Sequence, residues 1–263
     1  MKVGLAQIAS TSSKQENLSM LSAAVRSAAA DGAEVVVLPE FAMYNLPVPD
    51  SSFVEEAEPL DGPFATRVHG VAAREGVVVV FGMLESVGAD RAANTIVVTS
   101  PADLSVTAYR KIHLYEAFGA SESTLIQPAE DLAPVLFDAG GLRFGLNTCY
   151  DLRFPEVARR LVDEGADAVL LPASWAPGSR KEDHWSTLIR ARAIENTVYY
   201  VGVGQAPPIS VGNSMCVDPM GVVIAQLGEQ PGVMVVDVDA ERIAQVRRVN
   251  PCLTDRRFVV NPA

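Results

Sequence analysis

The pattern of apolar positions along the chain switches repeatedly between the period of a strand and the period of a helix. Short apolar runs and alternations predict strands, whereas apolar residues that recur every three to four positions predict helices. A continuous apolar run such as Val35–Leu38 indicates a strand that is covered on both faces. The predicted strands are 3–8, 35–38, 77–81, 93–99, 106–109, 135–137, 142–146, 168–171, 198–203, 211–217, 221–226 and 233–238. The predicted helices are about 18–28, 63–72, 155–162, 181–196 and 240–249.

This alternation of strands and helices predicts an α/β fold. We see no linker, low-complexity segment or block of like charge, so the simplest account is a single domain spanning residues 1–263. No glycine-rich nucleotide motif follows a predicted strand, and no pattern of ligand residues predicts a metal site. We therefore expect no cofactor and no metal.

The charge balance narrows the class of partner. With 21 Lys and Arg against 32 Asp and Glu, the net charge of −11 would repel nucleic acid and anionic lipid. No apolar run is long enough to span a membrane, and the N-terminus does not look like a signal peptide. The three cysteines form no close pair, which suits a reducing compartment. These features predict a soluble, cytoplasmic protein that binds neither nucleic acid nor a membrane.

Three residues with useful chemistry directly follow predicted strands, namely Glu40, Lys111 and Cys149. In one layer of parallel strands, the carboxyl ends meet at the same edge, where α/β folds bind their ligands. Cys149 lies at a turn from strand to helix, and a helix N-terminus favours the thiolate form of cysteine. Each residue also has an ordinary interpretation, as a loop glutamate, a surface lysine and a small buried cysteine.

The three residues together predict nucleophilic catalysis. A cysteine that attacks a carbonyl needs a base, and the Glu40 carboxylate could take the thiol proton and later activate water. The ammonium of Lys111 and the backbone N–H of Tyr150 could stabilise the oxyanion, at about 3 kcal/mol per donor. No histidine is a convincing partner for Cys149, because His113 has the setting of a hydrogen-bonded core residue. A papain-like mechanism is therefore disfavoured.

Three motifs, Leu38-Pro-Glu-Phe41, Tyr109-Arg-Lys-Ile-His-Leu114 and Cys149-Tyr-Asp-Leu-Arg-Phe-Pro-Glu156, resemble those of the nitrilase, or carbon–nitrogen hydrolase, superfamily. The resemblance extends over essentially the whole chain. It implies an α-β-β-α sandwich, the nitrilase-like four-layer fold, which pairs into a homodimer or a larger homo-oligomer. It also implies that Glu40 is the general base, that Lys111 stabilises the transition state and that Cys149 forms a thioester. A second glutamate of the family matches Glu122.

Within the superfamily, the chain resembles the branch of omega-amidases and deaminated glutathione amidases, which hydrolyse a terminal amide next to a carboxylate or a 2-oxo acid. We therefore expect a cofactor-free amidase that converts a small linear amide into a carboxylate and ammonia. The alternatives are an N-carbamoyl amide hydrolase or a nitrilase with the same three groups, and a non-catalytic binding protein of the same fold.

The segments expected to border the pocket depart from that branch, notably residues 175–185 and Asn213. The candidate substrate-binding residues are Tyr44, Trp175 and Arg180. Arg180, or its neighbour Lys181, could pair with a substrate carboxylate. The alternative interpretation is that both are solvated charges at the start of a helix.

Overall fold

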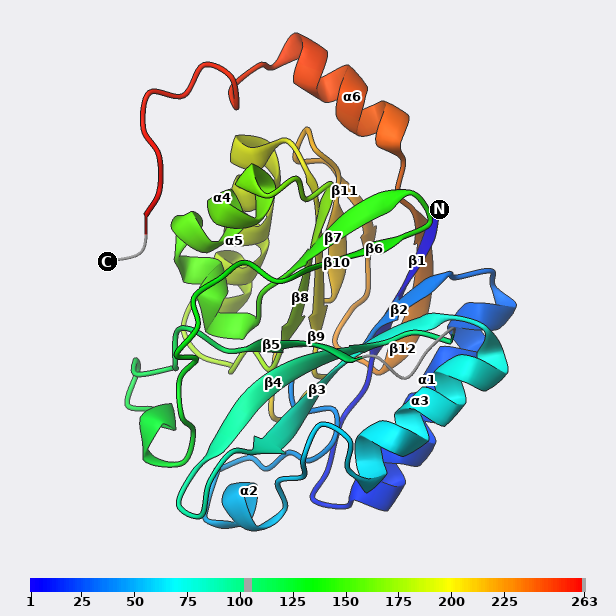
Figure 1. The fold of residues 1–263 in the computed structure, drawn as a ribbon, viewed down its shortest axis with the longest axis vertical. Helices are drawn as coiled ribbons and strands as arrows, with labels where there is room; N and C mark the ends of the chain where they lie inside the picture. The colour runs from blue at the N-terminus through cyan, green and yellow to red at the C-terminus, as the bar shows by residue number, and fades with distance from the viewer. Residues whose placement is uncertain (102–105, 262–263) are drawn as a thin grey trace.

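The computed structural model describes residues 1–101 and 106–261. Within these ranges, two six-stranded sheets pack face to face, and helices cover the outer face of each sheet (Figure 1). The predicted four-layer α-β-β-α sandwich is therefore confirmed. In the described ranges, no helix combines the length and the apolar character needed to cross a bilayer.

The first sheet has the strand order β12-β1-β2-β3-β4-β5, in which β1, β2 and β3 are parallel. Helices α1 (Lys14–Ala30) and α3 (Pro63–Glu75) lie side by side on its outer face (Figure 1). The short helix α2 (Ser52–Glu55) precedes α3. The strands are β1 (Lys2–Gln7), β2 (Val35–Val37), β3 (Val78–Ser86), β4 (Ala92–Thr99), β5 (Val106–Arg110) and β12 (Gly232–Asp237).

The second sheet has the order β11-β10-β9-β8-β7-β6, in which β7, β8 and β9 are parallel. Helices α4 (Pro155–Asp163) and α5 (Lys181–Asn196) cover its outer face, and α6 (Ala240–Val249) follows β12 at one end of the sandwich (Figure 1). The strands are β6 (Leu136–Ala139), β7 (Leu142–Leu146), β8 (Ala168–Ala173), β9 (Tyr199–Gly204), β10 (Met215–Val217) and β11 (Val223–Gln226).

The two-sided burial of the central strands explains their continuous apolar runs. In β2, Val35 and Val37 belong to the core between the sheets, whereas Val36 belongs to the core beneath α1 and α3. In β8, Leu170 faces the first sheet, and Val169 belongs to the core beneath α4 and α5. Because successive side chains of a strand point to opposite faces, every position must be apolar when both faces are covered.

Two predicted strands differ from the observed ones by more than two residues at one end. The run at 77–81 continues to Ser86, because β3 forms a long antiparallel hairpin with β4. The predicted strand 211–217 contracts to Met215–Val217, because Gly212 and Asn213 have φ values of +65° and +56°. Backbone in that left-handed region turns away from an extended path, so residues 211–214 form a loop.

Candidate active site

The structure brings Glu40, Lys111 and Cys149 together, although they do not follow strands of one layer. Glu40 and Lys111 follow β2 and β5 of the first sheet, whereas Cys149 follows β7 of the second. The expectation of one shared sheet edge was therefore wrong, and the three side chains meet across the two sheets. The Nζ atom of Lys111 lies 2.9 Å from Oε1 of Glu40. The Cys149 thiol is close enough to the Glu40 carboxylate for both charge and hydrogen bonding to act on it.

The Glu40 carboxylate is buried and held at both oxygens. Its Oε1 atom accepts hydrogen bonds from Nδ2 of Asn94 at 2.7 Å and from Nζ of Lys111 at 2.9 Å. Its Oε2 atom accepts a hydrogen bond from the backbone N–H of Ser174, in the second sheet's half of the molecule, at 2.6 Å. A Cβ atom on Gly82 would lie 2.6 Å from Cα of Glu40. The absence of a side chain at Gly82 therefore makes room for the backbone that carries Glu40.

Glu122 joins this group through Lys111. It begins the short 3-10 helix Glu122–Thr124, and its two oxygens accept hydrogen bonds from Nζ of Lys111 at 3.1 and 2.8 Å. Glu122 also accepts hydrogen bonds from Nδ2 of Asn94 at 3.0 Å and from the backbone N–H of Tyr115 at 2.7 Å. Burial alone would lower the pKa of the Lys111 ammonium, but Glu122 and Glu40 outweigh it and hold that pKa well above its ordinary value.

Asn94 is the member of this group that sequence reasoning missed. Its Nδ2 atom bridges the carboxylates of Glu40 and Glu122, and it is fully buried in β4. A buried amide is costly unless it is hydrogen-bonded, so an asparagine within the largely apolar stretch 92–99 was the available signal.

Cys149 has a left-handed backbone conformation, with φ of +45°. It begins the 3-10 helix Cys149–Arg153, and Thr148 and Asp151 form a capping box at the start of that helix. The buried Asp151 carboxylate also interacts with the ring Nδ1 of His113 at 2.8 Å and accepts a hydrogen bond from the Tyr109 hydroxyl at 2.7 Å. His113 thus supports the turn that carries Cys149.

The backbone N–H of Tyr150 lies in the first turn of the same 3-10 helix. The first N–H groups of a helix have no acceptor within the helix, so this N–H suits an oxyanion formed beside Cys149.

Burial raises the pKa of the Cys149 thiol well above its ordinary value, and the Glu40 carboxylate raises that pKa further, while Lys111 opposes the shift. The helix N-terminus was expected to favour the thiolate, but desolvation of the buried sulfur has the larger effect on the pKa. The resting thiol is protonated near neutral pH, and attack on a substrate requires a base to remove the proton.

We expect the alkylation of Cys149 by iodoacetamide to reach half of its maximal rate above pH 9.0, the ordinary pKa of the thiol. The variant Glu40→Gln lacks the negative charge that raises this pKa, so its half-maximal pH should be lower. Peptide mass mapping across a pH series would follow Cys149 separately from Cys216 and Cys252. A wild-type midpoint below 9.0, or no shift in the variant, would contradict this assignment.

A cavity of about 370 Å³ contains Cys149, Glu40, Lys111 and Glu122 in its wall, and we call it the Cys149 cavity. Most of its other wall is apolar or neutral. The remaining lining residues are Phe41, Asn45, Leu46, Pro47, Val48, Pro49, Phe53, Tyr115, Gly119, Ala120, Ser121, Thr124, Leu125, Ile126, Ser174, Ala176 and Ile209.

The three candidate substrate-binding residues lie outside this lining. The buried Tyr44 donates its hydroxyl proton to Oγ of Ser52 at 2.8 Å. The buried Trp175 donates its ring N–H to the backbone oxygen of Lys181 at 2.8 Å. The Arg180 side chain is exposed and forms an ion pair with Asp183 at 2.8 Å.

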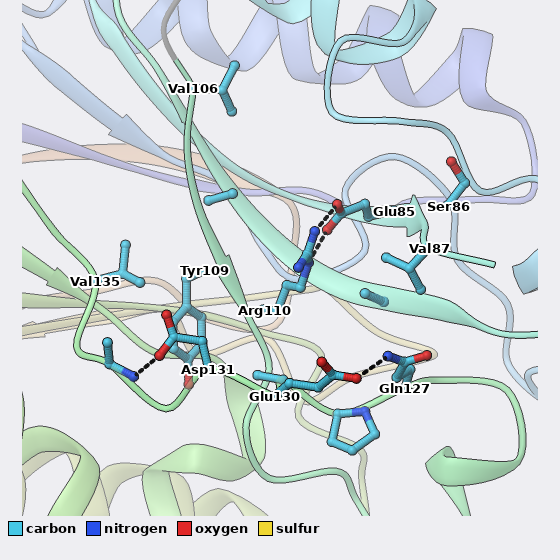
Figure 2. A pocket seen from close by; sticks show the side chains of 15 residues that line it. Glu85, Ser86, Val87, Val106, Tyr109, Arg110, Gln127, Glu130, Asp131 and Val135 are labelled. Atoms are coloured by element: carbon cyan, nitrogen blue, oxygen red, sulfur yellow. Dashed lines mark hydrogen bonds and ion pairs between the residues drawn. The ribbon is translucent and has the colours of Figure 1, made fainter.

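A larger cavity of about 700 Å³ lies beside β4 and β5, but no thiol lines it (Figure 2). Its charged groups already have partners, because Arg110 forms hydrogen bonds of 2.8 and 2.6 Å with the Glu85 carboxylate. Glu130 and Asp131 likewise contact Gln127 and a backbone N–H (Figure 2). Charged groups that already form hydrogen bonds with one another are less available to a ligand. The smaller Cys149 cavity is therefore the candidate active site. In residues 1–101 and 106–261, no group of three or more His, Cys, Asp or Glu side chains could hold a metal ion.

Comparison with known proteins agrees with this geometry. The family model of carbon-nitrogen hydrolases matches residues 2–248. A deaminated glutathione amidase of Escherichia coli O157:H7 is 36% identical over 258 residues, which cover 98% of each chain. The omega-amidase NIT2 of Bos taurus is 29% identical over 265 residues, which cover 97% of this chain and 95% of the relative.

A solved structure of a glutamate-to-glutamine mutant of the amidase from Nesterenkonia sp. AN1 has a TM-score of 0.81 and 26% identity, and the match covers 97% of each chain. In that mutant, the acetamide moiety of fluoroacetamide is covalently attached to the active-site cysteine. The chain described here belongs to the carbon–nitrogen hydrolase family and to the nitrilase superfamily. It is a hydrolase that acts on carbon–nitrogen bonds.

Proposed function

We propose that this protein hydrolyses a small linear amide of the omega type to a carboxylate and ammonia, without a cofactor, by way of a thioester on Cys149. The observation that carries the proposal is the shared position of Cys149, Glu40 and Lys111 in the wall of one cavity, with the lysine 2.9 Å from the glutamate. The names of the Escherichia coli and Bos taurus relatives support the choice of an omega-type amide.

The first half of the proposed reaction begins when the Glu40 carboxylate takes the thiol proton and Cys149 attacks the amide carbon. The resulting oxyanion receives hydrogen bonds from the Lys111 ammonium and from the backbone N–H of Tyr150. Glu40 then gives its proton to the leaving nitrogen, the carbon–nitrogen bond breaks, and ammonia departs. The acyl group remains on the sulfur as a thioester.

In the second half, the Glu40 carboxylate takes a proton from water, which attacks the thioester carbon. The carbon–sulfur bond breaks, the carboxylate product leaves, and the proton returns to the Cys149 sulfur. Glu122 holds the Lys111 ammonium in place and balances its charge, because both of its oxygens contact Nζ. Glu40 acts on the Cys149 thiol through both charge and a hydrogen bond, whereas Glu122 acts on it through charge alone and more weakly, so we assign Glu122 a supporting role.

Intact-protein mass spectrometry after brief mixing with monoamides of dicarboxylic acids tests this proposal. We expect the wild type to gain the mass of an acyl group and to release ammonia. The Cys149→Ser variant should show no thioester and little ammonia.

The same measurement separates the alternative reactions. If amides give neither adduct nor ammonia, N-carbamoyl compounds and nitriles are the next substrates to test. A reaction with either class alone would replace the proposed activity. The absence of any reaction would contradict an enzyme at this site and favour a non-catalytic binding protein.

A further inference from the structure

Lys181, at the start of α5, carries a buried ammonium with no acidic partner among the described residues. Its residue is only 4% exposed, and Nζ donates one hydrogen bond, to the hydroxyl of Tyr115 at 3.0 Å. The rings of Tyr115, Phe118 and Trp175 surround Nζ, each with its centre at 4.8 Å. A lysine ammonium has three N–H donors, so two of them face only aromatic rings.

A second cation lies beside the first. The guanidinium of Arg153 packs over the rings of Trp175 at 4.9 Å and Phe118 at 5.6 Å. Its Nη2 atom contacts the ring Nδ1 of His184 at 3.3 Å, and its buried Nε atom has no hydrogen-bond partner. None of the ion pairs found within residues 1–101 and 106–261 involves Lys181 or Arg153. A buried ammonium beside a half-buried guanidinium, with no anion between them, is costly, and a bound anion would offset that cost.

Lys181 lies against the wall of the Cys149 cavity, because its Nζ atom contacts Tyr115. Tyr115 lines the cavity, and so do Gly119 and Ala176, which are the neighbours of Phe118 and Trp175 in the chain. Burial lowers the pKa of the Lys181 ammonium, Cys149 acts in the opposite direction, and the positive charge of Arg153 lowers that pKa further. The ring that covers Lys181 on the outer side belongs to Phe118, which is 71% exposed.

We propose that Lys181 is a specificity-determining residue, which binds a carboxylate on the acyl part of the substrate while the amide reacts at Cys149. The carboxylate would accept hydrogen bonds from the two N–H donors of Lys181 that now face aromatic rings, and Arg153 would add a second positive charge. This inference rests on the proposed amidase function and deepens it. It predicts that the preferred substrate carries an anionic acyl group. The proposed catalytic side chains alone would not distinguish such a substrate from a neutral amide.

The competing account gives Lys181 a purely structural role. Tyr115, which accepts its hydrogen bond, also donates its backbone N–H to Glu122. Lys181 could therefore only anchor the loop that carries Glu122. The two accounts differ in one measurable respect, because loss of an anchor would slow all amides, whereas loss of an anion site would slow only anionic ones.

Glutaramate and 5-methylhexanamide form a suitable pair of substrates, because the neutral isopropyl end of the second has nearly the shape of the carboxylate in the first. The quantity to measure is the ratio of their kcat/KM values, in the wild type, Lys181→Met and Lys181→Arg. We expect Lys181→Met to lower the ratio by roughly tenfold to a hundredfold, the range for a lost hydrogen bond to a charged group. Lys181→Arg should retain most of the ratio.

Arg180→Met is the matched control, because it removes the adjacent cation, which is exposed and paired with Asp183. It should leave the ratio unchanged. Equal losses for both amides in Lys181→Met would overturn the anion site and support the anchor. Glutarate should also slow the alkylation of Cys149 by iodoacetamide, a measurement that does not depend on turnover. This protection should be weaker in the Lys181→Met variant.

Failure of the inference can be told apart from failure of the proposed function. If both amides acylate Cys149 but Lys181→Met leaves the ratio unchanged, the amidase stands and the anion site falls. If neither amide acylates Cys149 in the wild type, the proposed function falls, and the inference falls with it.

Discussion

Replacing Cys149 with alanine is expected to lower the turnover of any amide substrate by roughly ten thousandfold or more, as is typical when an enzyme nucleophile is removed. Alanine has no atom that can form the proposed thioester, and no other thiol lines the Cys149 cavity. Ammonia release under saturating substrate would measure the loss, and intact-protein mass spectrometry should show no acyl adduct.

The other two cysteines provide matched controls for this variant. Cys216 is fully buried in β10 between the sheets, and Cys252 lies in the tail after α6. Neither lines the Cys149 cavity, so Cys216→Ala and Cys252→Ala should retain near-normal turnover. If Cys149→Ala were active, or if Cys252→Ala were inactive, the nucleophile would have to be reassigned.

The second large effect is expected for Glu40→Gln, which should lower turnover by at least roughly a hundredfold, the lower range for loss of a general base. Glutamine keeps the shape of the side chain, and its amide oxygen can still accept hydrogen bonds from Lys111 and Asn94. Its NH₂ group would then face the backbone N–H of Ser174, which now donates to Glu40 at 2.6 Å. The variant therefore loses the base and one hydrogen bond, but no packing volume.

Circular dichroism and thermal unfolding would show whether the Glu40→Gln variant keeps its fold. The comparison variant is Glu122→Gln, which leaves the contact between Glu40 and the thiol intact and should lower turnover less. A Glu40→Gln enzyme with near-normal activity would remove Glu40 from the role of base, whatever its stability.

Much of this architecture could be predicted from the chain, because the central strands are buried on both faces. The run Val35–Leu38 has no polar position, and only a strand with a layer on each side requires that. Glu40, Lys111 and Cys149 could be identified because each directly follows such a run, and because the residues around them form recognisable motifs.

Other features depend on tertiary contacts that no local pattern encodes. The bridge from Asn94 to two carboxylates requires β4 to lie beside the loop of Glu122, which is 28 positions away in the chain. Lys181 looks like a solvated charge at a helix start, and only the structure shows three aromatic rings around it. The predicted strand 211–217 failed at Gly212 and Asn213, because apolar neighbours do not reveal a left-handed backbone.

The division of the site between two sheets has a consequence for the chain during its synthesis and folding. Glu40 and Lys111 are made early in synthesis and belong to the first sheet, whereas Cys149 and Ser174 come later with the second. If Cys149 and Glu40 act as proposed, neither half alone holds both the thiol and its base, so a nascent or half-assembled molecule would have no activated nucleophile to acylate by mistake. A small slip of one sheet against the other would also uncouple base from thiol while every helix and strand persisted. Turnover is therefore a more sensitive gauge of correct docking between the sheets than any measure of secondary structure.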